Sequence, residues 1–342
     1  MTATLASAAD KLMSDYMDLK AGETVLITAD TDGDEAVWRA VQEASLRAGA
    51  TASVLLIPAL PYQGRLADPY VTATTSAAVK ACDVWIDVTF PYLAGSELHD
   101  EAMEAGHIRY LLGADLNSDG LLRLFGRVDL DRYFAVHHAF DHLVNEAVGK
   151  TVRITDKAGT DVSFTLGQRG FEKPRRASQP GTVLVPGSCT MFPDVETVKG
   201  TIEVGSVFHE YYTPLTAPMT IEVDGRIKAI HGGGNERSVA DRALRRAGTD
   251  GRYGYIIHFT HGIHPAARVT GGSFIEDMRT QGNNAIGMGM PWWDPGGGEN
   301  HPDAILYMHT VDIDGVRVVE DGEIVGPESL VALAADLEPL LG

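Results

Sequence analysis

The chain has 342 residues, enough for two domains of ordinary size, each with its own core. Its 28 basic and 47 acidic residues give a formal net charge of -19, which would repel phosphate backbones and anionic lipid surfaces. We therefore expect no nucleic-acid partner and no membrane partner. Residues 1–19 carry no basic, apolar leader, and no run of about 18 apolar residues occurs, so we expect a cytoplasmic protein.

The first part of the chain alternates between apolar runs and amphipathic segments. The predicted elements are, in order, a helix over 5–19, a strand over 22–29, a helix over 35–48, a strand over 53–58, a helix over 73–81, a strand over 83–89, a helix over 98–105, a strand over 108–112 and a helix over 131–147. This alternation predicts an α/β domain with a doubly wound, mostly parallel sheet over residues 1–148. Its first loop, Asp30–Asp34, is acidic and has a single glycine, which excludes a glycine-rich dinucleotide cradle.

The sequence pattern changes after residue 148. Short β-prone runs at 151–154, 161–166, 201–204, 220–223 and 226–230 are separated by glycine turns, and Asp224-Gly225 and Asp314-Gly315 are typical of two-residue hairpins. Helices are predicted over 235–247 and 328–340. We therefore expect residues 149–342 to form a second, largely antiparallel α+β domain. Its Cys189 and the distant Cys82 are typical of buried thiols, and we expect neither a disulfide nor a thiolate metal site.

The second domain also contains a pattern that suits a metal ion. His301 and Asp303 are two residues apart at the start of an apolar run, so in an extended chain both side chains point to the same side. The third ligand would come from the strand-like stretch that holds His258, His261 and His264. His258 is the best placed of the three because it lies in the apolar part of that strand, before Gly262 breaks it.

Geometry limits the other candidates. His309 shares strand parity with Asp303 but would lie roughly 20 Å from it along an unbroken strand. Two histidines and one carboxylate form the set that leaves an octahedral Fe(II) with open positions for substrate and oxygen. The same residues also suit a core histidine at 258 and a surface turn at 301–303, and the pattern alone does not separate these alternatives.

Four segments resemble, in the same order, the C-terminal half of the aminopeptidase T-like metallopeptidase superfamily. They are residues 258–265, residues 282–289, the pair His301-x-Asp303 and residues 311–322. In the aminopeptidases a glutamate takes the place of His258, and a histidine ligand falls near Ala285. Both departures are similar to the branch of 2,5-dihydroxypyridine 5,6-dioxygenases. In that branch two histidines and an aspartate hold one Fe(II), and the matching residues here are His258, His301 and Asp303.

The resemblance implies a non-haem Fe(II) enzyme that uses O₂ to cleave a hydroxylated N-heteroaromatic ring, most simply 2,5-dihydroxypyridine to N-formylmaleamate in nicotinate catabolism. The alternatives are a metal-dependent aminopeptidase and a metal-free binding protein on the same scaffold. A homo-oligomer is expected.

Three further residues or segments could contribute: the resemblance suggests His99 and Glu196, and the sequence itself suggests the stretch with Trp292 and Trp293. His99 falls at a Leu-His step suited to a general base, although a helix-start histidine is the simpler interpretation. Glu196 falls where the peptidases have another carboxylate ligand, and here it could equally be an outer partner of the site or a strand-end acid. Trp292 and Trp293 precede three glycines and could cover an aromatic substrate or serve as packing anchors.

Overall fold

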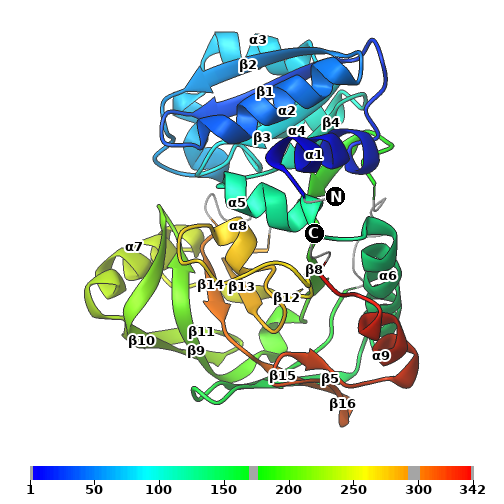
Figure 1. The fold of residues 1–342 in the computed structure, drawn as a ribbon. Helices are drawn as coiled ribbons and strands as arrows, with labels where there is room; N and C mark the ends of the chain where they lie inside the picture. Colours follow the sequence, from blue (N-terminus) through cyan, green and yellow to red (C-terminus); the bar gives the residue numbers. More distant parts are fainter. Residues whose placement is uncertain (1–2, 169–175, 292–300, 340–342) are drawn as a thin grey trace.

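The computed structural model describes residues 3–168, 176–291 and 301–339. Two sheets organise the chain, and Figure 1 shows the first lying above the second. None of the described helices has the length and apolarity that a membrane crossing requires.

The first sheet contains five parallel strands in the order β2-β1-β3-β4-β7. Its strands are β1 (Thr24–Asp30), β2 (Thr51–Ile57), β3 (Val84–Val88), β4 (Arg109–Leu112) and β7 (Gly181–Leu184). Strands β3 and β4 are buried along their whole length, as in parallel sheets that are covered on both faces. The strand order runs outward from β1 in both directions, which confirms the predicted doubly wound α/β architecture.

Helical segments connect these strands and continue toward the second sheet. They are α1 (Leu5–Asp10), η1 (Lys11–Tyr16), α2 (Glu35–Arg47), η2 (Gly64–Tyr70), α3 (Ala73–Lys80), α4 (Glu97–Glu104), α5 (Ser118–Leu121), η3 (Leu122–Gly126) and α6 (Leu130–Glu146). Helix α2 shows why they form where they do: Asp34 caps its first turn by accepting a hydrogen bond from the Ala36 amide, and Arg47 lies in its last turn.

The second sheet is antiparallel throughout its named strand pairs, as predicted. Its strands are β5 (Thr151–Thr155), β6 (Asp161–Thr165), β8 (Ser188–Met191), β9 (Lys199–Phe208), β10 (Tyr212–Asp224), β11 (Arg226–Gly232), β12 (Tyr255–Gly262), β13 (Asn284–Gly289), β14 (Asp303–Leu306), β15 (Thr310–Ile313), β16 (Val316–Glu320) and β17 (Glu323–Ile324). Its helical segments are η4 (Val195–Thr197), η5 (Gly234–Glu236), α7 (Arg237–Ala247), α8 (Phe274–Asp277) and α9 (Glu328–Ala335).

Strands β9 to β14 of this sheet close into a barrel. Each pairs with the next along the chain, and β14 returns to pair with β9. Closure satisfies the backbone groups that an open edge would expose. The ring of hydrogen bonds therefore holds β12, β13 and β14 side by side, and these strands carry the residues singled out in the sequence.

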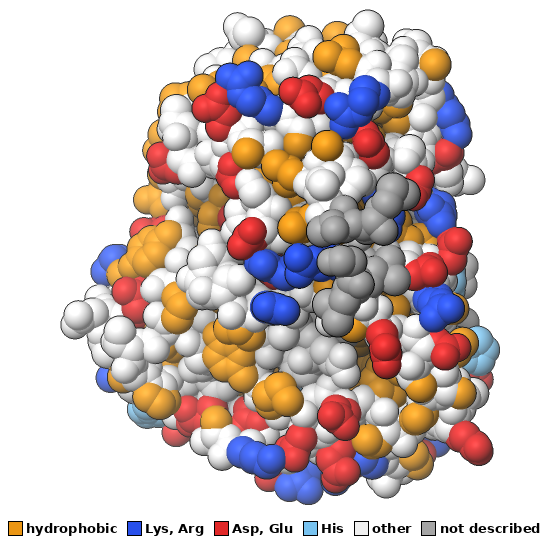
Figure 2. All heavy atoms as spheres, in the orientation of Figure 1, with side chains coloured by type: hydrophobic (Ala, Val, Ile, Leu, Met, Phe, Trp, Pro, Cys, Tyr) orange, Lys and Arg blue, Asp and Glu red, His pale blue; other side chains and the backbone are white. Residues whose placement is uncertain are grey.

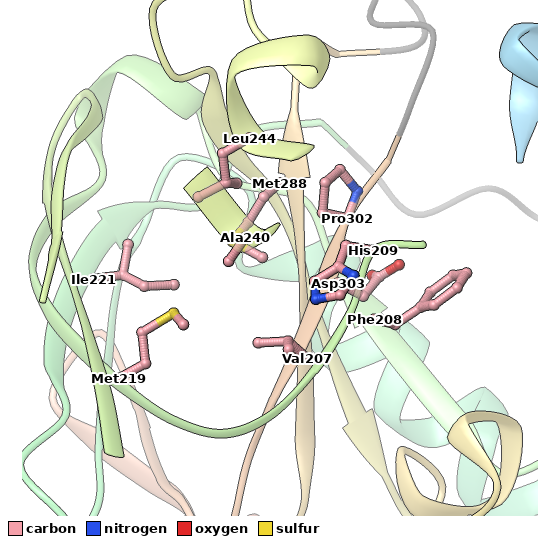
Figure 3. A pocket seen from close by; sticks show the side chains of 10 residues that line it. All are labelled: Val207, Phe208, His209, Met219, Ile221, Ala240, Leu244, Met288, Pro302 and Asp303. Atoms are coloured by element: carbon pink, nitrogen blue, oxygen red, sulfur yellow. The ribbon is translucent and has the colours of Figure 1, made fainter. Parts of the chain in front are cut away.

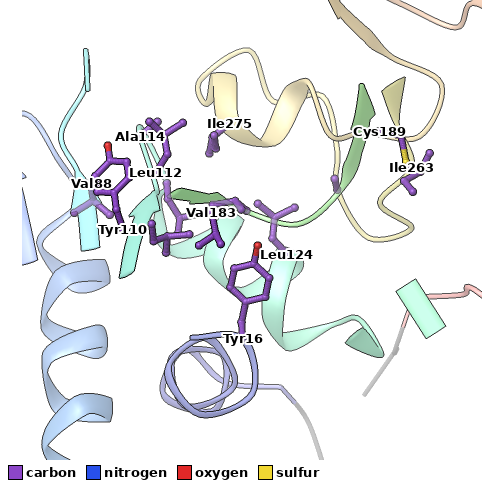
Figure 4. Close-up of a cluster of buried hydrophobic side chains, with 14 of the residues drawn as sticks. Tyr16, Val88, Tyr110, Leu112, Ala114, Leu124, Val183, Cys189, Ile263 and Ile275 are labelled. Atoms are coloured by element: carbon purple, nitrogen blue, oxygen red, sulfur yellow. The ribbon is translucent and has the colours of Figure 1, made fainter. Parts of the chain in front are cut away.

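The larger of two apolar clusters runs through both sheets. Figure 4 shows part of it, with Tyr110 and Val183 from the first sheet, Ile275 from α8 and Cys189 from β8. The two sheets are also joined by an ion pair between Arg123 of η3 and Glu276 of α8, with Nε–Oε1 2.5 Å apart and Glu276 fully buried.

The end of the last helix differs from the prediction, and the predicted domain boundary is not tested by the structure. The sequence predicts that the closing helix reaches residue 340, but α9 ends at Ala335. Pro339 disfavours helical backbone at the residue before it, Glu338, so a continuous helix to residue 340 is unfavourable. The domain boundary at residue 148 stays a prediction. The second sheet begins at Thr151, and β7 then returns to the first sheet.

Candidate metal centre

The candidate centre is built on a row of residues across three neighbouring strands. His258 of β12 lies opposite Gly287 of β13, and Gly287 lies opposite Asp303 of β14. Directly opposed residues of antiparallel strands present their side chains on the same face. A bulge at Ile257, where the β12–β13 register shifts, precedes His258, and such bulges re-aim the side chain that follows them.

His301 completes the group from the extended chain just before β14. Its Nε2 lies 3.0 Å from His258 Nε2 and 3.7 Å from Asp303 Oδ1, and His258 Nε2 lies 3.4 Å from the same carboxylate oxygen. Ligands on adjacent positions of an octahedral ion, each about 2.1 Å from it, are roughly 3 Å apart. The three side chains therefore have the spacing of one face of an octahedral site.

Gly287 supports this interpretation independently. A Cβ at residue 287 would come closer than 3.0 Å to the Nε2 atoms of both His258 and His301. The space between the imidazoles and the carboxylate exists because this residue has no side chain. The absence of a side chain at residue 287 thus leaves a space next to two histidines and an aspartate, which is what a bound ion would need.

Burial and hydrogen bonding prepare the histidines to act as ligands. His301 is neutral near pH 7, because burial lowers its pKa to about 4 against the opposing effect of Asp303. Neutral imidazole is the form that binds metals. Thr260 Oγ1 lies 3.1 Å from His258 Nδ1 and 3.0 Å from Thr190 Oγ1. A hydrogen bond donated from Nδ1 to Thr260 leaves the Nε2 lone pair of His258 facing the group.

The first sheet also contributes to the centre. Gln63, in the loop after β2, is buried and donates from Nε2 to the carbonyl of His301. Burial raises the pKa of Tyr92, in the loop after β3, well above its ordinary value, and the negative charges of Asp303 and Asp115 raise it further. Loops at the carboxyl ends of parallel strands are where open α/β sheets bind their ligands.

Aromatic side chains line this side of the centre. Phe208 of β9 lies directly opposite Asp303 in the β9–β14 ladder. Its ring stacks on Phe90 at a centroid distance of 4.6 Å and lies 5.8 Å from the ring of Tyr92. The group thus lies beside aromatic side chains from both sheets.

A pocket extends from Asp303 into the barrel, where α7 covers it (Figure 3). Its lining is mainly apolar and includes Val207, Met219, Ile221, Leu244 and Met288. Val207 and Met288 are the strand neighbours of Phe208 and Gly287, so this pocket lies on the inner face of the barrel strands, and the three candidate ligands lie on the other face.

Comparison with known proteins identifies the family. The model of the 2,5-dihydroxypyridine 5,6-dioxygenase family, NicX, matches residues 11–326, nearly the whole chain. The chain belongs to this family. It is a dioxygenase that cleaves the ring of 2,5-dihydroxypyridine, and the alternative of an aminopeptidase is not favoured. No curated protein sequence matches the chain.

Two solved structures share the fold of this dioxygenase. The 2,5-dihydroxypyridine dioxygenase from Pseudomonas putida KT2440 superposes with a TM-score of 0.73 at 20% identity, over 95% of this chain and 98% of that one. Wild-type AmpT from Thermus thermophilus superposes with a TM-score of 0.65 at 14% identity, over 94% of this chain and 99% of that one. The resemblance seen in the sequence is thereby confirmed at the level of the fold.

The other histidines of the dioxygenase have separate surroundings. His261 and His309 are both buried and lie against each other, with Nδ1 of the first 2.5 Å from Nε2 of the second. His264 Nδ1 accepts hydrogen bonds from the amides of Ala266 and Ala267, and its Nε2 donates to the Leu124 carbonyl. None of the three belongs to the group around Asp303.

The structure places the remaining candidates as follows. His99 lies on α4, with Nε2 2.9 Å from Thr182 Oγ1 and its ring edge-on to Tyr110, so its role as a base stays a prediction. Glu196 is exposed on η4 and is outside the metal-binding groups found among the described residues. Trp292 and Trp293 lie outside the described residues.

Sequence reasoning missed Gln63, Tyr92, Thr260 and the function of Gly287. Thr260 was the only one with a local signal, because it is two residues from His258 on the same strand face. Gln63 and Tyr92 reach the centre from loops of the other sheet, a contact that no periodicity within their own segments indicates.

Proposed function

We propose that the dioxygenase works with a single Fe(II) ion held by His258, His301 and Asp303. The observation that carries the proposal is the convergence of two imidazoles and one carboxylate above the bare face of Gly287. The donor set matches the two-histidine, one-carboxylate site of Fe(II) oxygenases. Such a set leaves the ion with a net charge of about +1 and with positions for both substrates.

When bound, the iron would bring the ionised substrate and O₂ together and allow the electron transfer that ring cleavage requires. The protein residues hold this arrangement. His258, His301 and Asp303 would hold the ion, and Thr260 orients the His258 ring. The product would be N-formylmaleamate.

Aromatic residues from both sheets would bind the ring of 2,5-dihydroxypyridine. Phe208 lies opposite Asp303, and the ring of Tyr92 lies 5.8 Å from the ring of Phe208; offset packing of the substrate on such rings would contribute about 0.5–1.5 kcal/mol beyond area burial. Burial raises the pKa of Tyr92 further above neutrality, so its hydroxyl stays protonated and can donate a hydrogen bond to the substrate or accept one from it. Ionisation of a ring hydroxyl needs a base, and His99 remains our candidate because an imidazole titrates near neutral pH.

Metal analysis and variants test the ligand assignment. Protein purified without oxygen is expected to bind about one iron per chain and to consume O₂ when 2,5-dihydroxypyridine is added. His258→Ala, His301→Ala and Asp303→Asn should each lose iron and turnover while keeping the circular dichroism of the parent. His309→Ala removes a buried imidazole outside the group and is the matched control, expected to keep its iron. Stoichiometric iron and activity in Asp303→Asn would disprove the assignment.

A separate variant tests the base. His99→Gln is expected to keep iron and substrate affinity while kcat falls by about 10²–10⁴-fold, the usual contribution of general acid–base catalysis. The fall should diminish at high pH, where the ring hydroxyl ionises without help. A normal kcat in His99→Gln would place the base elsewhere.

The cytoplasmic location and the homo-oligomeric state stay predictions. Sedimentation velocity of the purified protein tests the oligomeric state.

A further inference from the structure

A second group of metal-binding side chains lies on the opposite face of the strand that carries His258. Cys189 of β8 pairs with His261 of β12. Paired residues share a face, and His261 is three residues from His258, so the two histidines point to opposite sides of an unbulged strand segment. Cys189 therefore faces away from the iron site, toward α6, whose Phe140 ring contacts His261.

Helix α6 presents two further ligand types to Cys189. His137 and Asp141 are four residues apart, so they share one helix face, and His137 Nε2 lies 3.7 Å from Asp141 Oδ1. One ligand atom from each of Cys189, His137 and Asp141 lies within 4.8 Å of the other two. Nitrogen and oxygen ligands that lie about 2.0–2.1 Å from a tetrahedral ion are about 3.3–3.4 Å apart, so a small rotation of His137 or Asp141 would bring both onto one ion.

The surroundings suit a site that is ordered but accessible. Cys189 as a whole residue is 1% exposed, whereas the side chains of His137 and Asp141 are 12% and 27% exposed. The Tyr133 hydroxyl lies 3.4 Å from His137 Nδ1 and accepts a hydrogen bond from the Gly187 amide. An oxygen at the second ring nitrogen is the usual partner of a metal-binding histidine, since it leaves Nε2 directed at the ion.

We propose that Cys189, His137 and Asp141 form a second metal site that binds zinc, with water as a fourth ligand. Thiolate sulfur, imidazole nitrogen and carboxylate oxygen are the three donor types that zinc combines in proteins. The thiolate separates this site from the iron site, whose nitrogen and oxygen donors include no sulfur. A zinc ion here would connect α6 to the barrel strands. This revises the expectation from the sequence that neither cysteine binds a metal.

Cobalt(II) provides the test because it replaces zinc and reports its ligands by absorption. Metal-free protein titrated with Co²⁺ should develop a thiolate-to-cobalt charge-transfer band in the near ultraviolet and the strong visible bands of four-coordinate cobalt. Cys189→Ser should lose the charge-transfer band. Asp141→Asn and His137→Gln change half-buried side chains, so they should fold normally. Even an outer partner of a metal ligand is worth about 10–100-fold in affinity, so each should weaken Co²⁺ binding by at least about tenfold.

Two control proteins make the result specific. Cys82→Ser removes the other buried cysteine, which lies next to the first sheet, and should keep the band. Asp303→Asn impairs the iron site and should also keep it, so failure of this inference is distinct from failure of the proposed function. The site is disproved if no charge-transfer band forms, or if the band survives in Cys189→Ser. Unchanged Co²⁺ affinity in Asp141→Asn and His137→Gln would equally disprove it, leaving Cys189 as a plain buried thiol beside a helix ion pair.

Discussion

Gly287 stands between His258 and Asp303 in the row that crosses three strands, and its missing side chain leaves room for an ion. In Gly287→Ala the new methyl group would occupy the space between the two imidazoles. We expect this variant to lose iron and turnover while its melting temperature changes by only a few degrees, because the clash falls on side chains that can rotate away. Iron analysis and thermal melts test this.

Gly272→Ala is the matched control for that substitution. Its added methyl group would meet nothing within 4 Å, so iron content should stay at the parent level. A Gly287→Ala protein with full iron would show that the histidines do not hold an ion in the observed arrangement.

Gln63 holds the backbone of His301 from the other sheet. In Gln63→Glu the donated hydrogen bond is lost and a carboxylate faces a carbonyl oxygen. We expect the iron affinity to fall by about 10–100-fold, the usual effect of losing a partner outside the ligand shell. A competition titration with a chelator measures this affinity. Gln42→Glu breaks a comparable bond, from Gln42 Nε2 to the Ala52 carbonyl at 3.2 Å, and should leave the affinity unchanged.

At the scale of elements, the turn after β12 should confer acid sensitivity. Burial lowers the pKa of His264 to about 4, and its Nδ1 must stay unprotonated to accept two amide hydrogen bonds. The unfolded chain therefore binds this proton more readily than the folded chain. The contribution of neutral His264 is complete above about pH 6.5 and is lost as the pH falls toward 4, by about 3 kcal/mol in all.

Urea unfolding between pH 4 and 7 measures this effect. His264→Asn should be less stable than the parent at pH 7 but should lose less stability on acidification. His107→Asn, at an exposed position, should follow the parent curve. Equal pH slopes for the parent and His264→Asn would contradict the prediction.

The elements differ in how far they could be predicted from the sequence. The helices and strands of the first sheet have strong local periodicity, and their positions agree with the prediction to within a few residues. Strands β7 and β8 were not predicted, because each belongs to a ladder formed with a distant segment.

The same limit applies to the candidate site. His301 and Asp303 are neighbours in sequence, so their shared direction could be predicted. The register that places Gly287 between His258 and Asp303 could not, since it depends on how distant strands pair. The group around Cys189 was missed for the same reason: helix α6 and strand β8 come together only in the folded chain.

At the scale of the whole molecule, the return of β7 to the first sheet links the two parts of the chain. A fragment of residues 1–148 would lack β7 and would expose the outer edge of β4. It would also lose the hydrogen bond from the Tyr16 hydroxyl to the Leu184 carbonyl. We expect this fragment to self-associate through its open edge.

Light scattering and size-exclusion chromatography test this expectation, with the full chain as control. A synthetic peptide of residues 176–187 should reduce the association by pairing with β4, whereas a peptide of the same composition in scrambled order should not. A monomeric fragment with normal circular dichroism would show that β7 is dispensable for the first sheet.

The late position of β7 also matters while the protein is being made. Residues 113–180 separate β4 from β7, so a ribosome adding about 5–20 residues per second needs about 3–14 s to supply the missing strand. During that interval the nascent first sheet has an unsatisfied edge of backbone donors and acceptors. A growing chain in this state is a natural client for chaperones that shield strand edges, and slow codons between β4 and β7 would lengthen its exposure.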